Sequence, residues 1–166
     1  MTKIFLLAFF IFFYIDANAS DTFSVEETFS PRVIIPDNVV ADLSKSLSLE
    51  EYGCREKNLA EALEATAIKL NSNLHSILVK PRAWCLCGAS SCPMWIYQLE
   101  NNHAKQIWFY PGTHGVEITD KMHKGYRQVR ISNTSVRGEI YEAIWVWDGR
   151  KYKLFREKHN TKNIDE

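Results

Sequence analysis

The sequence predicts an α+β fold: a mainly antiparallel β-sheet of aromatic-rich hairpins, preceded by one or two N-terminal helices and stapled by disulfides. Helical patterning is confined to the chain before residue 70. From residue 94 to 155, β-branched and aromatic runs alternate with turn residues, as is typical of strands. Three of the four cysteines lie within residues 85–92, and cysteines this close in an exported chain indicate a covalent staple.

Residues 1–19 have the pattern of a secretory signal peptide. Lys3 gives a cationic start, and residues 4–15 form an apolar run that is too short to span a membrane. Ala17-Asn18-Ala19 is the small-x-small pattern that signal peptidase reads, so we expect cleavage after Ala19. The junction carries no cysteine for a lipid. We therefore expect a periplasmic or secreted protein with no stable membrane anchor after cleavage.

The remaining length suits one domain. We predict an extended arm over residues 20–36, a single α+β domain over 37–158 and a polar tail over 159–166. The formal charge is zero, but residues 20–64 are rich in Asp and Glu whereas Lys and Arg dominate 121–158. This asymmetry indicates either a surface for an acidic partner or complementary faces of one fold. Because the chain is expected to be exported, we expect no nucleic-acid partner.

Four cysteines allow three pairings. A bridge between Cys85 and Cys87 would close a strained ring, so we discount that pairing. The two others join Cys54 to one member of this pair and Cys92 to the other. We favour Cys87–Cys92, which closes a short loop, together with Cys54–Cys85, which attaches the N-terminal half to the sheet. In the loop-entropy model each bridge contributes about 2 to 4 kcal/mol.

Two segments of the N-terminal half have helical character. After the apolar run 33–35, which is short enough for an edge strand, Asp37 is placed to cap a helix that ends near residue 47. Residues 58–70 have two possible structures. Asn58 can cap a helix, and the residues after it have high helix propensity. A hairpin centred on residues 71–73 instead makes at least the later part of this segment a strand.

The pattern of the C-terminal half predicts a series of β-hairpins. We expect a central strand where the chain is apolar on both faces, at 140–147, and a two-residue turn at Asp148-Gly149. At 126–132, Val129 and Ile131 alternate with polar residues, which predicts a half-buried strand. The other expected strands are 94–99 and 106–110, joined as a hairpin, then 115–118 and 152–155.

Three motifs carry a resemblance that covers about residues 68–155. They are Cys87-Gly88 to Cys92-Pro93-Met94-Trp95-Ile96-Tyr97, Gly125-Tyr126-Arg127 and Trp147-Asp148-Gly149-Arg150-Lys151-Tyr152. Together they resemble a loose group of exported bacterial proteins of unknown function. The resemblance implies a small β-rich domain, similar to the repeats of integrin-type propellers, with an Asp-rich loop before the cysteine loop. Here that loop, residues 69–73, has no carboxylate for a hard cation, and the group brings no catalytic residues.

Three groups of residues in the sequence have the composition of a reactive or metal site. Cys85 and Cys87 could form a redox-active dithiol, but their apolar neighbours would raise a thiol pKa, so structural disulfides are favoured. Ser90-Ser91 lacks the Gly-x-Ser-x-Gly turn of a hydrolase. The histidines show no compact zinc-ligand spacing; they are His75, His103, His114, His123 and His159. From the three groups together we expect no catalytic residue, no metal and no cofactor.

The aromatic residues outnumber what a small core needs, which predicts a binding surface for another protein. Core packing is the competing interpretation for each of them. The first hypothesis is therefore a small exported binding protein that engages, for example, a wall-degrading enzyme or a toxin. The alternatives are a thiol-disulfide oxidoreductase using Cys85/Cys87 and a structural or stress-related envelope protein. The candidate surface comprises Trp84, Trp95, Tyr97, Trp108, Tyr110, Trp145 and Trp147.

Overall fold

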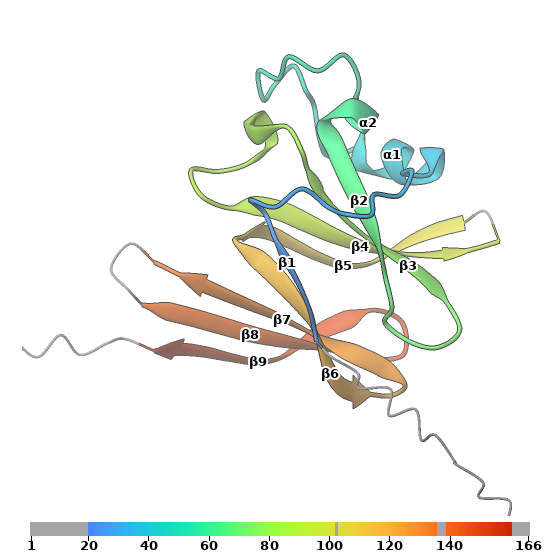
Figure 1. The fold of residues 1–166 in the computed structure, drawn as a ribbon, viewed down its shortest axis with the longest axis vertical. Helices are drawn as coiled ribbons and strands as arrows, with labels where there is room; N and C mark the ends of the chain where they lie inside the picture. Colours follow the sequence, from blue (N-terminus) through green and yellow to red (C-terminus); the bar gives the residue numbers. More distant parts are fainter. Residues whose placement is uncertain (1–19, 102, 136–138, 161–166) are drawn as a thin grey trace, which may run out of the picture.

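Two antiparallel sheets pack face to face, and two short helices lie on the outer face of one of them (Figure 1). The computed structural model describes residues 20–101, 103–135 and 139–160. The N-terminal sheet has the strand order β2-β3-β4-β5, and the C-terminal sheet has the order β1-β6-β7-β8-β9. The predicted α+β class and the disulfide staples are confirmed, although the strands form two sheets rather than one. The predicted signal peptide lies outside the described residues.

The bounds of the elements follow the chain. They are β1 (Asp21–Ser24), α1 (Asp37–Leu43), α2 (Leu59–Ala62), β2 (Leu63–Ile68), β3 (His75–Pro81), a 3₁₀ turn (Trp84–Leu86), β4 (Cys92–Glu100), β5 (His103–Thr113), β6 (Gly115–His123), β7 (Tyr126–Thr134), β8 (Ile140–Trp147) and β9 (Tyr152–Asn160).

The N-terminal sheet is covered on both faces. Along β3, Leu78 faces the C-terminal sheet, whereas its neighbours Ile77 and Val79 belong to the core under the helices. β4 repeats this pattern, with Ile96 on the first face and Tyr97 on the second. Because both faces are buried, these strands read as continuous apolar runs rather than as alternating ones.

The C-terminal sheet buries mainly one face. Val129 and Ile131 of β7 lie in the core between the sheets, which confirms the predicted half-buried strand. β8 is paired on both sides, with β7 and β9. The predicted two-residue turn after it is wrong, because Trp147 pairs with Tyr152 and leaves a four-residue turn, residues 148–151. The Asp148 carboxylate stabilises this longer turn by accepting two backbone N–H groups within it.

The predicted N-terminal arm is part of the fold. Its strand β1 pairs with β6 of the C-terminal sheet, and Val33 pairs with Ala65 at the edge of the N-terminal sheet. The arm therefore crosses from one sheet to the other and straps them together. The predicted polar tail is also corrected, because β9 extends to Asn160 and includes its first residues.

The helices are shorter than predicted. α1 ends at Leu43 instead of near residue 47, and Asp37 is its first helical residue, with Pro36 in the cap position and no side-chain cap. Asn58 does cap α2, since its Oδ1 accepts the N–H of Glu61 at 3.0 Å. α2 has only four residues before the chain becomes β2. The start of residues 58–70 is therefore helical and the later part is a strand.

Candidate protein-binding surface

A short 3₁₀ turn presents Trp84 to solvent. The Trp84 side chain is 61% exposed, whereas Leu86 at the end of the turn is buried. Backbone hydrogen bonds hold the chain that leads into the turn, because the N–H groups of Arg82 and Ala83 both donate to the carbonyl of Ala62. Within the turn, the N–H of Cys87 donates to the carbonyl of Trp84 at 3.0 Å. The backbone that carries the exposed indole is therefore held on both sides.

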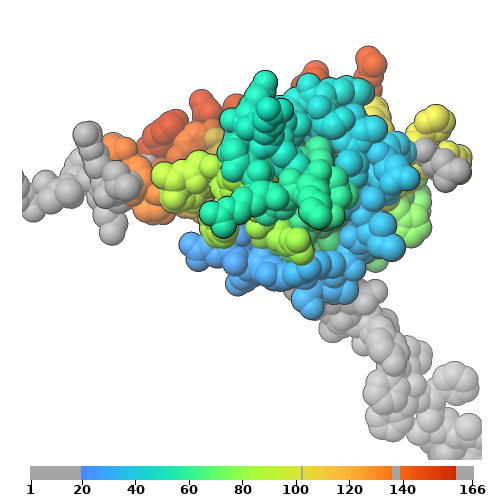
Figure 2. Space-filling model, turned by 90° about the horizontal axis from the view of Figure 1, so that it is seen from above, coloured from blue at the N-terminus to red at the C-terminus, as the bar shows by residue number. Residues whose placement is uncertain are grey.

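Two disulfides begin within three residues after Trp84, at Cys85 and Cys87. Cys54 bonds to Cys85 and Cys87 bonds to Cys92, which is the pairing favoured from the sequence. Cys85 packs against the core under the helices, whereas Cys87 packs against the core between the sheets. The turn is thus tied covalently to both cores of the protein. Figure 2 looks onto this side of the molecule, where atoms of the cysteine-loop region, in yellow-green, lie beside the N-terminal residues in cyan and green.

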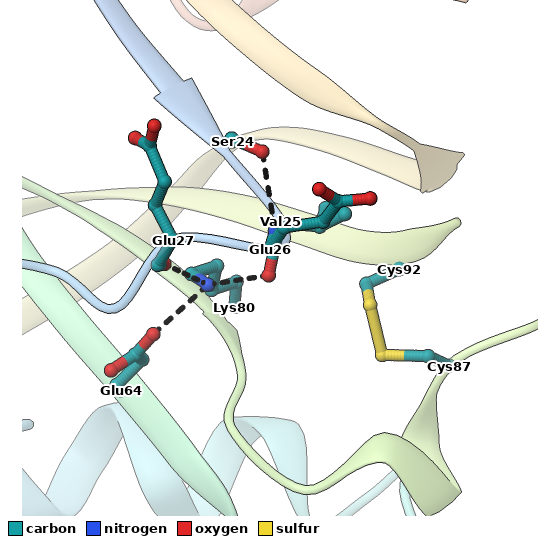
Figure 3. The surroundings of a disulfide bond; sticks show 8 residues. All are labelled: Ser24, Val25, Glu26, Glu27, Glu64, Lys80, Cys87 and Cys92. Carbon is teal, nitrogen blue, oxygen red and sulfur yellow. Dashed lines mark hydrogen bonds and ion pairs between the residues drawn. A yellow bond between two sulfur atoms is a disulfide. The ribbon is translucent and has the colours of Figure 1, made fainter. Parts of the chain in front are cut away.

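A buried lysine clamps the N-terminal arm next to the turn (Figure 3). Lys80 Nζ donates to the carbonyl oxygens of Val25 (2.8 Å) and Glu27 (2.7 Å) and pairs with Glu64 Oε1 at 2.9 Å. These three acceptors use all three ammonium donors. The ring of Phe29 lies 4.9 Å from Nζ, and the side chains of Lys80 and Glu64 are each 3% exposed. Sequence reasoning missed this pair, because its members lie on different strands and no local pattern marks them.

The surface next to Trp84 is polar and carries both signs of charge. A small cavity of about 80 Å³ lies between the clamp and the turn, and its lining includes Glu26, Glu27, Arg82 and Trp84. These three charged side chains are exposed. A single large aromatic surrounded by polar groups is the arrangement found at the energetic centres of protein interfaces.

The predicted aromatic surface is largely wrong. Its other members pack inside the protein because either the facing sheet or the helical layer covers them, and only Tyr110 among them is half-buried. Trp108 meets Trp145 edge to face at 5.7 Å in the core between the sheets. The buried members are Trp95, Tyr97, Trp108, Trp145 and Trp147. Of the seven residues proposed from the sequence, Trp84 alone is mostly exposed.

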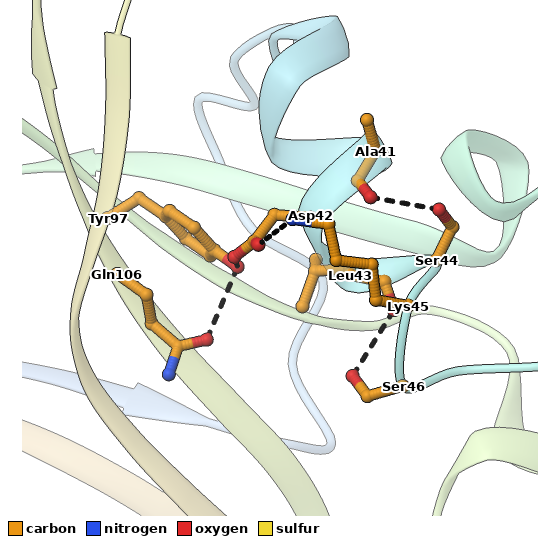
Figure 4. Close-up of polar contacts among 8 residues, drawn as sticks. All are labelled: Ala41, Asp42, Leu43, Ser44, Lys45, Ser46, Tyr97 and Gln106. Atoms are coloured by element: carbon orange, nitrogen blue, oxygen red, sulfur yellow. Dashed lines mark hydrogen bonds and ion pairs between the residues drawn. The ribbon is translucent and has the colours of Figure 1, made fainter.

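Tyr97 has a structural role (Figure 4). Its hydroxyl donates to Asp42 Oδ2 of α1 at 2.9 Å, and Gln106 Oε1 lies 3.3 Å away as a second acceptor. Burial and the hydrogen bond to Asp42 raise the pKa of Tyr97 above its usual value. Hydrogen bonds from Lys45 and Tyr97 lower the pKa of Asp42. This contact attaches α1 to the N-terminal sheet.

The reactive groups considered from the sequence are not brought together as an active site. All four cysteines are bridged, and Cys85 and Cys87 have different partners. Ser90 Oγ lies 3.4 Å from His114 Nε2, but no described carboxylate is hydrogen-bonded to that imidazole. The one group of possible metal ligands in the described ranges is Cys54, Glu56 and Cys85, and its two sulfurs are bonded to each other.

Comparison with known proteins found no matching family model, no matching curated protein and no matching solved structure. Within residues 20–160 as described, no helix is long and apolar enough to cross a membrane. The two disulfides fit a protein of an oxidising compartment, such as the periplasm or the outside of the cell.

Proposed function

We propose that this chain is an exported binding protein that engages another protein through Trp84. The observation that carries the proposal is the exposure of this indole, 61%, on a turn that two disulfides tie to the two cores. Tryptophan is enriched among the residues that contribute most to binding. A turn that is already ordered loses little conformational entropy when it binds, so more of the contact energy becomes affinity.

The partner is a protein of the same compartment, for example a wall-degrading enzyme or a secreted toxin. A single projecting indole fits a partner that has an apolar slot, such as a substrate cleft. The charged side chains of Glu26, Glu27 and Arg82 would meet the polar rim of that slot. Such rim charges set the orientation of the two proteins more than their affinity.

Replacing Trp84 with alanine tests the proposal. A photo-crosslinking residue at a flanking exposed position would capture the partner from the exported fraction, and the purified partner would then be titrated. We expect Trp84→Ala to weaken binding about 30-fold or more, as for other interface hot spots. Phe155→Ala is the matched control, because Phe155 is 64% exposed on β9, and it should leave affinity unchanged. Equal affinities for the two variants would contradict the proposal.

The same preparation separates the alternatives. Alkylation of the native, unreduced protein should label no cysteine. Two reactive thiols would favour the oxidoreductase using Cys85/Cys87. Failure to capture any stoichiometric partner would favour a structural or stress-related envelope protein.

A further inference from the structure

A basic groove lies at the edge where the two sheets meet. It is an open cavity of about 350 Å³ between the start of β5 and the β8–β9 turn. Its lining consists of Lys105, Gln106, Asp148, Arg150, Lys151 and Lys153. In Figure 1 this edge lies at the right of the view, whereas the turn of residues 84–86 lies at the upper left. The groove is therefore a surface separate from the one around Trp84.

Asp148, the single acidic residue among the described residues of the lining, already has its hydrogen-bond and ion-pair partners within the β8–β9 hairpin. Its Oδ1 accepts the N–H groups of Arg150 (2.7 Å) and Lys151 (2.9 Å), and its Oδ2 pairs with Lys153 Nζ at 2.9 Å. These contacts, with the hydrogen bond from the Lys151 N–H as the largest cause, hold the pKa of Asp148 well below its usual range. Asp148 therefore stays ionised and also occupies the backbone donors of the turn.

Three cations of the groove have no counterion. Lys105, Arg150 and Lys151 are exposed, and in the described part of the chain none of their side chains makes an ion pair. Lys124 adds a further positive charge, because its Nζ donates to the Asp148 carbonyl at 3.3 Å. Five cations thus surround one internally paired carboxylate. The groove has a positive field that favours an anionic ligand.

We propose that this groove binds an acidic segment of a partner protein, with carboxylates facing Lys105, Arg150 and Lys151. The chemistry favours carboxylates over phosphates, because a phosphate site typically offers free backbone N–H groups, and Asp148 occupies those of Arg150 and Lys151. Among the described residues, the lining contains no aromatic side chain on which a nucleic-acid base could stack. Lysine side chains on a strand and a turn can follow carboxylates at varied spacings along an extended segment.

A peptide titration of the full-length mature protein tests the proposal. The probe is a twelve-residue peptide of alternating Glu and Ser, and a peptide with Gln in place of Glu is the neutral control. Binding is followed by ¹H–¹⁵N NMR at low salt. We expect shifts centred on the amides of residues 105 and 148–153, no binding of the Gln peptide, and weaker binding when about 0.3 M NaCl is added.

A matched pair of triple variants separates the groove from general electrostatics. Lys105→Gln, Arg150→Gln and Lys151→Gln together remove two lysines and one arginine from the groove. Arg55→Gln, Lys57→Gln and Lys69→Gln together remove the same charges from exposed positions in the N-terminal half. We expect the groove variant to bind the Glu peptide about tenfold more weakly or worse, and the control variant to bind within about twofold of the parent.

Two results would overturn the proposal. One is an equal loss of affinity in the two triple variants. The other is stronger binding at the groove of a short DNA duplex, inorganic phosphate or anionic vesicles than of the Glu peptide. Neither result bears on Trp84, whose test uses a different surface and a different variant.

Discussion

The two sheets differ in how they are covered. The C-terminal sheet packs one face on the N-terminal sheet, and its residues contribute no cysteine to either disulfide. The N-terminal sheet needs a second covering layer, because its outer face carries Ile77, Val79 and Tyr97. That layer is thin, since α1 has seven residues and α2 has four, and helices of this length are not stable alone. The disulfide Cys54–Cys85 attaches this outer layer, where noncovalent packing is weakest.

The largest expected effect comes from the clamp between the arm and the N-terminal sheet. Lys80→Met keeps the side-chain volume but leaves two arm carbonyls without their donor. It also removes the buried cation from the Glu64 carboxylate, which keeps an ion pair with the partly exposed Arg32 at 3.2 Å. We expect the free energy of unfolding, measured in urea, to fall by about 3 to 5 kcal/mol. The same substitution at the exposed Lys69 is the control and should cost little.

A second variant tests the cause of this loss. Adding Glu64→Leu to Lys80→Met should restore part of the stability, because it removes the buried charge that Lys80 compensated. If Lys80→Met alone is as stable as the parent, the arm is not held by this clamp.

The disulfides test whether the outer layer depends on its covalent link. The bridge Cys54–Cys85 spans 31 residues and Cys87–Cys92 spans five. In the loop-entropy model, replacing both cysteines of a pair with alanine costs about 3.5 kcal/mol for the first bridge and about 2 kcal/mol for the second. Loss of Cys54–Cys85 should speed amide hydrogen exchange in α1 and residues 44–58, with the exchange of β7 and β8 unchanged. Faster exchange throughout both sheets would show that the two layers unfold together.

Gly115 tests how closely the arm approaches the C-terminal sheet. A Cβ at this position would lie 2.7 Å from the carbonyl oxygen of Phe23 in β1. We expect Gly115→Ala to displace β1 and to cost about 1 to 3 kcal/mol, measured by urea unfolding. Gly88→Ala is the control, because a Cβ there meets its nearest atom at 3.5 Å, an ordinary contact. Equal stability of the two variants would mean that β1 can shift without cost.

The smallest expected effect concerns the bond between α1 and the N-terminal sheet. Tyr97→Phe removes the hydroxyl that donates to Asp42, and we expect a loss of about 1 kcal/mol near neutral pH. The loss is small because the Asp42 side chain is 41% exposed, so water can replace the lost hydroxyl as a hydrogen-bond donor to it.

The pH dependence of this loss identifies the bond. The pKa of Tyr97 is raised in the folded protein, so its contribution is complete below the usual tyrosine value of 10.0 and is lost as pH rises above it. The pKa of Asp42 is lowered, so its contribution is present above 3.8 and is lost as pH falls below it. Urea unfolding should therefore show the largest difference between parent and Tyr97→Phe between these two values. A difference that does not change with pH would mean that Tyr97 acts through packing alone.

Much of the local structure could be predicted from the sequence. The alternation around Val129 and Ile131 predicts a half-buried strand, because side chains of a strand point to opposite faces in turn. Ring size excludes a bridge between Cys85 and Cys87 and leaves two pairings, of which the one favoured from the sequence is the one that forms. Asp148-Gly149 predicts the place of the turn after β8 correctly but not its length. The turn is longer because Asp148 accepts two N–H groups that a two-residue turn would not present to it.

The candidate surface could not be predicted in the same way. Among the seven aromatics proposed, the sequence does not distinguish Trp84 from Trp95, because each lies beside the cysteine loop. They differ because Trp95 is on a strand that the helical layer covers, whereas Trp84 is on a turn that no described element covers. The basic groove likewise combines Lys105 of one sheet with Arg150 of the turn between two strands of the other.

The sequence by itself determined most of the strands, the places of the turns and the exclusion of a Cys85–Cys87 bridge, because side-chain period, turn chemistry and ring closure act over a few residues. Only the tertiary structure decided that the strands divide into two sheets at residues 113–115, that the arm straps those sheets through Lys80, and that Trp84 stays exposed. Each of these features depends on what covers a face or pairs a buried charge. The covering or pairing group is supplied by a segment distant in the chain, and no local pattern specifies it.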